Sequence, residues 1–74
     1  MSIEIELFGQ LLPGAQRRQM LNMERPVSAQ EVANILGLNL EEVGLITIDG
    51  VQSEKEDAVE SGSRLCFFPP MSGG

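Results

Sequence analysis

The stretch RLCFFPPMSGG at residues 64–74 joins an apolar segment of strand length to a short tail. Residues 64–68 are apolar and aromatic after the first position, which favours a β-strand. Pro69 and Pro70 follow, and because proline has no N–H to donate to a sheet, the strand is expected to end near Phe68. The stretch therefore predicts a final strand that leads into an extended proline step and then into the last four residues.

The two glycines that stand last, Gly73 and Gly74, give this tail its chemistry. An α-carboxyl group has an ordinary pKa of roughly 3.3–3.7, so it is ionised at neutral pH and can attack an activated phosphate. A diglycine has no side chains and can enter a narrow slot. Residues 71–74 span at most about 13–14 Å when extended. We therefore expect the tail to deliver its carboxylate into another protein's active site; the alternative is a frayed terminus without function.

Two strands are expected before the helix. Ile3, Ile5 and Leu7 alternate with Glu4 and Glu6, the period of a strand with one buried face. Residues 9–16 contain a Pro-Gly pair and predict a loop, and residues 18–24 predict the returning strand of a hairpin.

A helix is predicted from Ala29, because Ser28 and Glu31 form a capping box and Gly37 supplies a C-terminal stop. Its apolar stripe sits at i, i+3, i+4 and i+7, with Ile35 alongside. The stripe comprises Ala29, Val32, Ala33 and Leu36.

The second half of the chain predicts a hairpin and a loop before the final strand. Residues 38–43 favour an irregular or short helical turn capped by Asn39. Residues 45–48 and 51–52 flank the turn sequence Asp49-Gly50. Residues 53–63 are polar and predict a surface loop, with one helical turn around residues 57–60 as an option.

This order of elements predicts an α+β roll, with one helix packed across a mixed sheet of about five strands. If the first and last strands pair in the centre, the tail leaves from the middle of one sheet end. We expect residues 1–70 to form the domain and residues 71–74 a flexible tail.

Size and charge limit the function classes. With 74 residues of which 42% are hydrophobic, a core supplies only about 3–5 kcal/mol. A catalytic cleft would have to be hollowed from that core, which favours a carrier or binding module over a stand-alone enzyme. Eleven acidic residues against five basic ones give a net charge of −6. We therefore expect no nucleic acid and no membrane as ligands, and a partner with a basic surface.

The remaining composition predicts a cytoplasmic protein that binds no metal and no cofactor. Cys66 is the single cysteine and histidine is absent, which argues against a disulfide and a zinc site. No segment approaches 18 apolar residues, and Glu4 and Glu6 stand where a signal peptide would need positive charge. There is also no phosphate-binding glycine motif, so an adenylating enzyme would have to be another chain.

The element order and the ending at residues 64–74 resemble the MoaD/ThiS family of ubiquitin-like β-grasp sulfur carriers, and most of all the small subunit of molybdopterin synthase. The resemblance implies that Gly74 is adenylated with ATP by a separate E1-like enzyme and becomes a thiocarboxylate. That group would enter the large synthase subunit and donate sulfur to a pterin precursor of the molybdenum or tungsten cofactor. Gly73 would lie in the channel, with Met71 and Ser72 at its entrance.

Other carrier and binding roles remain open. The thiamine-pathway carrier and other thiolation carriers have the same kind of tail, and a ubiquitin-like protein modifier or an interaction module is the alternative class.

The last strand also predicts a docking patch. If Leu65 and Phe67 point at the helix, Phe68 is a partly exposed aromatic at the root of the tail. Phe8 opposes the buried residues of the first strand. It is expected either to join Phe68 there, beside Pro69 and Pro70, or to fill the core at the end of the sheet. Cys66, by contrast, is interpreted as a small hydrophobic residue rather than a sulfur donor.

Overall fold

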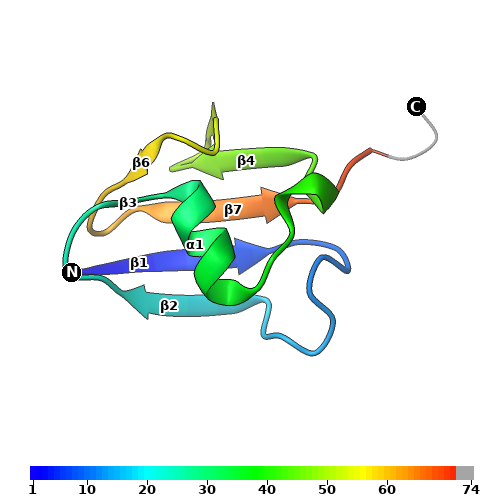
Figure 1. The fold of residues 1–74 in the computed structure, drawn as a ribbon, viewed down its shortest axis with the longest axis horizontal. Coiled ribbons are helices and arrows are strands. Elements are labelled where there is room, and N and C mark those ends of the chain that lie inside the picture. The colour runs from blue at the N-terminus through cyan, green and yellow to red at the C-terminus, as the bar shows by residue number, and fades with distance from the viewer. Residues whose placement is uncertain (72–74) are drawn as a thin grey trace.

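The computed structural model describes residues 1–71 and contains one five-stranded sheet, one small sheet and one helix (Figure 1). The main sheet has the strand order β2-β1-β7-β4-β5. Its strands are β1 (Ser2–Leu7), β2 (Arg18–Asn22), β4 (Leu45–Ile48), β5 (Val51–Ser53) and β7 (Arg64–Phe68). Strands β1 and β7 pair in parallel at the centre, and the other neighbours are antiparallel. The predicted mixed β-grasp sheet is confirmed.

Helix α1 (Ala29–Leu36) packs across one face of this sheet (Figure 1). Both halves of the capping box form between Ser28 and Glu31, and Gly37 ends the helix with a φ of 80°. Cβ crowding makes that left-handed conformation unfavourable for other residues, which explains the glycine. The predicted stripe packs on the sheet, but Ile35 is 55% exposed and does not belong to it.

A second sheet of two short strands corrects the prediction for residues 53–63. Strand β3 (Val27–Ser28) pairs with β6 (Ala58–Val59), where the sequence had suggested a loop or a helical turn. The first helical N–H groups donate to nearby carbonyls, from Ala29 to Asp57 at 3.2 Å and from Gln30 to Lys55 at 2.9 Å. The segment therefore closes the N-terminal end of α1, where backbone donors lack intrahelical partners.

The remaining local predictions are confirmed with two changes of bounds, one of which is that β5 includes Ser53. The short 3-10 helix η1 (Leu40–Glu42) is capped by the Asn39 side chain. Asp49 and Gly50 form the β4–β5 turn with φ angles of 54° and 82°. Strand β2 ends at Asn22 rather than at residue 24.

The core lies between α1 and the main sheet. Ile3, Ile5, Leu65 and Phe67 point towards the helix and are fully buried. Because side chains alternate along a strand, their neighbours point to the opposite side of the sheet. We call that side, away from α1, the open face.

Candidate functional site

The aromatic pair Phe8 and Phe68 lies on the open face, where the sheet ends. Their rings stack with centroids 4.4 Å apart and planes within 7° of parallel. Both side chains are half-buried. Such a pair is worth about 0.5–1.5 kcal/mol beyond its buried area. The expectation that Phe8 joins Phe68 beside the start of the tail is confirmed.

The proline step after β7 passes between two glycines. A Cβ on Gly44 would lie 2.5 Å from Cα of Pro70, 2.8 Å from its nitrogen and 2.9 Å from the carbonyl oxygen of Pro69. A Cβ on Gly9 would lie 2.8 Å from Cγ of Pro69. At Gly44 only a residue without a side chain lets the two backbones approach this closely, and at Gly9 the ring of Pro69 occupies the space that a side chain would need. We call Gly9, Gly44 and the two prolines the tail root.

Hydrogen bonds fix the strand end that precedes the tail root. The Gly44 N–H donates to the Phe68 carbonyl at 2.8 Å, and the Phe8 N–H donates to the Phe67 carbonyl at 3.0 Å. Beyond this point Met71 is 93% exposed. In Figure 1 the chain leaves the sheet past β7, at the end opposite the N-terminus.

An apolar hollow of about 510 Å³ lies at this exit. It is lined by Gly44, Leu45, Phe68, Pro69, Pro70 and Met71. The structure thus brings together five of the predicted site residues: Phe8, Phe68, Pro69, Pro70 and Met71. The other three, Ser72, Gly73 and Gly74, lie outside the described residues.

Cys66 lies on the open face between Glu6 of β1 and Thr47 of β4, and it is only 6% exposed. It is a free cysteine. This burial agrees with its interpretation as a small hydrophobic residue and keeps the thiol away from solvent.

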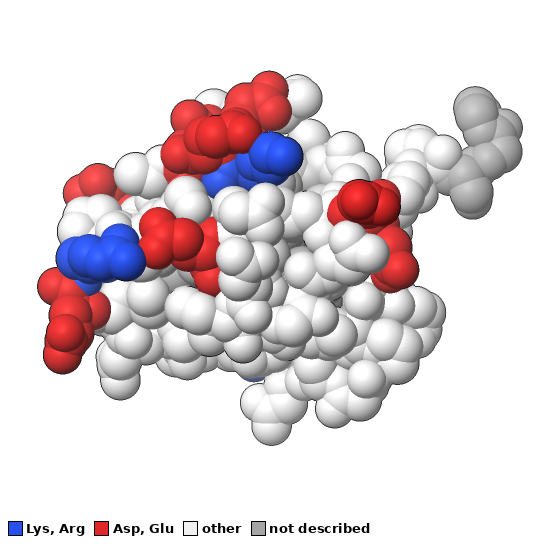
Figure 2. Space-filling view, viewed as in Figure 1, with Lys and Arg blue, Asp and Glu red and all other residues white. Residues whose placement is uncertain are grey.

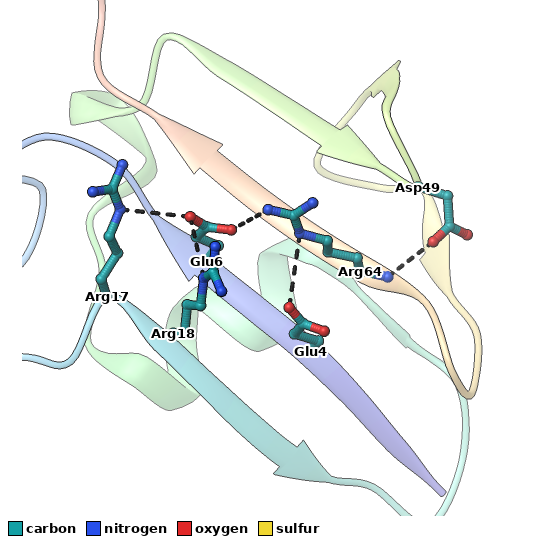
Figure 3. Close-up of polar contacts among 6 residues, drawn as sticks. All are labelled: Glu4, Glu6, Arg17, Arg18, Asp49 and Arg64. Atoms are coloured by element: carbon teal, nitrogen blue, oxygen red, sulfur yellow. Dashed lines mark hydrogen bonds and ion pairs between the residues drawn. The ribbon is translucent and has the colours of Figure 1, made fainter.

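A polar cluster that sequence reasoning missed surrounds Glu6 (Figure 3). Glu6 is only 3% exposed, although its place in the strand pattern had suggested a wet face. Its carboxylate contacts Arg17 at 3.5 Å and Arg18 at 3.6 Å, and it accepts a hydrogen bond from Arg64. That hydrogen bond, with help from the other guanidiniums, holds the pKa of Glu6 below its usual value against the opposing effect of burial.

Cross-strand pairing brings Arg18 and Arg64 to Glu6, and Arg17 reaches it from the residue just before β2. Glu6 lies opposite Arg18 in β2 and next to β7, which begins with Arg64. Arg17 also places its guanidinium 4.7 Å above the Phe8 ring, a cation–π distance. Only the topology of the whole sheet brings residues 6 and 64 together, so no local sequence pattern could have predicted their contact.

Residues 1–71 hold no cluster of three or more histidine, cysteine or acidic side chains suited to a metal ion. Within the same range, the helices are too short or too polar to cross a membrane.

The sheet order, the parallel central pair and the single helix define the ubiquitin-like β-grasp fold. Among solved structures, SAMP1 from Haloferax volcanii is similar over 100% of both chains, with 21% identity and a TM-score of 0.77. Another crystal structure of H. volcanii small archaeal modifier protein 1 gives 17% identity and a TM-score of 0.76 over 95% of this chain and 98% of that one.

A third similar structure comes from a biosynthetic complex. A chain from the complex of subunits 1 and 2 of molybdopterin-converting factor from Helicobacter pylori 26695 gives 20% identity and a TM-score of 0.65, with 100% of both chains covered. No protein-family model matches the chain, and neither does any curated protein. The predicted MoaD/ThiS-like ubiquitin-like fold is therefore confirmed, and the function is a separate question.

Proposed function

We propose that this protein is a sulfur carrier that works through the carboxylate of Gly74. A separate E1-like enzyme would adenylate the Gly74 carboxylate with ATP and release pyrophosphate. A sulfide-level sulfur nucleophile from a separate donor would then attack the adenylate carbonyl, so that AMP leaves and a thiocarboxylate remains. The acceptor would be a pterin precursor held by the large subunit of a molybdopterin synthase. In this scheme the chain binds no cofactor itself and is not catalytic alone.

The observation that carries the proposal is the tail root. The central strand β7 of the β-grasp sheet continues directly into Pro69-Pro70, and Gly9 and Gly44 lie in close contact with these prolines. The next residue, Met71, is almost fully exposed. Because the domain fixes where the chain departs, the residues after Met71 start from a defined position, which suits delivery of a terminal group into another protein's pocket.

A protein modifier is the second candidate, because the similar structures with the higher TM-scores are those of small archaeal modifier protein 1. In that role the activated Gly74 would form an isopeptide bond with a lysine of another protein. Both roles share the activation step and differ in the group that accepts the terminal carbonyl.

Intact mass spectrometry of the protein purified from its native host separates the two roles. A thiocarboxylate exchanges one oxygen for sulfur, whereas conjugation adds the mass of a second protein. The same spectrum establishes which residue bears the terminal carboxylate. We expect ATP-dependent activation of the parent chain to be abolished by deleting Gly74 or by appending one residue after it, with an unchanged melting temperature. Normal activation of the extended chain would overturn both roles.

A further inference from the structure

The charge of this protein is distributed unevenly between its two sides. Three of its five basic residues, Arg17, Arg18 and Arg64, gather around Glu6 on the open face; we call these three the arginine cluster. The acidic residues that contact these arginines are Glu4, Glu6 and Asp49, so the six residues together are neutral. The whole net charge of −6 therefore belongs to the rest of the molecule, and Figure 2 shows acidic side chains prevailing on the helix side.

Arg17 and Arg18 contact Glu6 near the end of β1 that is closest to the tail root, whereas Arg64 begins β7 at the opposite end and reaches towards Glu6. Glu6 is the one carboxylate between the three guanidiniums, while Glu4 contacts Arg64 from the other side at 3.8 Å. The Asp49 carboxylate accepts from the Arg64 backbone N–H at 2.9 Å and lies beyond that arginine (Figure 3). Arg17, stacked on Phe8, continues the positive charge to the aromatic pair.

The arginine cluster has more donors than Glu6 can accept. Each guanidinium has five N–H groups, whereas one carboxylate has two oxygens. The side chains of Arg17, Arg18 and Arg64 are 63%, 71% and 48% exposed, so donors remain available to solvent. The Glu6 side chain is 4% exposed and orients the three arginine side chains through its contacts with them. Arginines that are already oriented lose less entropy when they bind an anion.

We propose that the open face binds acidic side chains of the E1-like enzyme that receives the tail for activation. The guanidinium forks fit carboxylates with two hydrogen bonds each. The neighbouring Phe8 and Phe68 would pack on apolar groups of the same partner, since aromatic residues and arginine are the usual anchors of interfaces. The surface is continuous with the tail root, so one partner can hold the face and receive the tail. This inference rests on the proposed function and adds the chemistry of the partner.

The proposal and the net charge of the protein predict partner surfaces of opposite charge. A charge of −6 taken as a whole favours a basic partner, and removing any positive charge would then speed association. The arginine cluster instead predicts that neutralising one of its members slows association, whereas neutralising a basic residue elsewhere does not. Arg18 and Lys55 make a matched pair, because both are exposed and each change removes one positive charge.

The first test is an amide NMR titration of the full chain with an oligoglutamate peptide at low salt. We expect saturable shifts at Arg17, Arg18, Arg64 and Phe68. Arg18→Gln should weaken this binding about two- to fivefold, the range of one exposed ion pair, and Lys55→Gln should leave it unchanged or strengthen it. Shifts scattered over the surface, equal effects of the two variants, or tighter binding of single-stranded DNA at the same residues would overturn the proposal.

The second test measures association of the same variants with the E1-like enzyme of the same organism by stopped flow. We expect Arg18→Gln to slow association and to reduce its salt dependence. Lys55→Gln should neither slow association nor reduce its salt dependence. Faster association of Arg18→Gln would overturn the inference. The peptide titration needs no activation of the tail, so failure of Gly74 chemistry and failure of the open face give different results.

Discussion

Gly44→Ala tests whether the tail root positions the tail. The added Cβ would lie 2.5 Å from Cα of Pro70, whereas carbon atoms in contact stay about 3.5–4.0 Å apart, so the chain must shift by roughly 1–1.5 Å. The obstructing atoms are backbone atoms of residues 69 and 70, and no change of rotamer relieves the clash. Gly44 is not among the glycines with positive φ, so alanine brings no left-handed strain there.

Gly44→Ala should lower the stability of the fold to a moderate degree. Pro70 is exposed and can move outward, at the expense of the hydrogen bond from the Gly44 N–H to the Phe68 carbonyl. Losing that bond costs about 0.5–1.5 kcal/mol. Because the obstructing atoms belong to the backbone, we expect a total loss of about 1–3 kcal/mol, the usual cost of overpacking. Each kcal/mol lowers Tm by about 4–8 °C for a domain of this size.

The effect on activation should be larger, because a misplacement of about 1 Å can cost about 100-fold in rate. We expect kcat for adenylation by the E1-like enzyme to fall by about that factor, measured by ATP–pyrophosphate exchange with saturating carrier. Gly37→Ala is the control: its φ is 80° and no atom lies within 4 Å of the added Cβ, so it strains the backbone without contacting the tail root. Full activity of Gly44→Ala, or equal losses in both variants, would refute positioning by the tail root.

Three further predictions concern the open face. Phe68→Ala should weaken partner binding by about 30-fold or more, because an interface aromatic commonly costs about 2 kcal/mol, and titration against the partner with a parallel melt checks this; unfolding of the variant would place Phe68 in the core instead. Cys66→Ala should lower the free energy of unfolding by about 1 kcal/mol and leave sulfur transfer intact, and loss of transfer in the folded variant would make the thiol functional. The pKa of Glu6 is lowered in the folded state, so its ion pairs stabilise above the unfolded pKa of about 4.3–4.5, and this contribution is lost as pH falls through the folded pKa. Glu6→Gln should therefore be less stable than the parent near pH 7, with the difference shrinking below about pH 4.5 in denaturant titrations, and a constant difference across that range would contradict the assignment.

Local signals in the sequence determined the elements whose causes lie within a few residues. The capping box, the Gly37 stop and the Asp49-Gly50 turn each depend on side chains or φ angles inside one turn of chain, and all three are confirmed. Alternation also predicted correctly which face of β7 is buried, because a strand has only two faces. The same reasoning predicted the half-exposed aromatic pair, once β1 and β7 were placed side by side.

Only the tertiary structure decided the features that depend on pairing between distant segments. Strand β6 exists because Val59 and Ala58 pair with residues 27 and 28, a partner that no local pattern near residue 58 indicates. Glu6 is buried because the topology places arginines from two other segments above it. The glycines at 9 and 44 are needed because two separate loops approach the prolines at 69 and 70. Each of these is a contact between residues far apart in sequence, and such contacts are fixed by how the elements pack together.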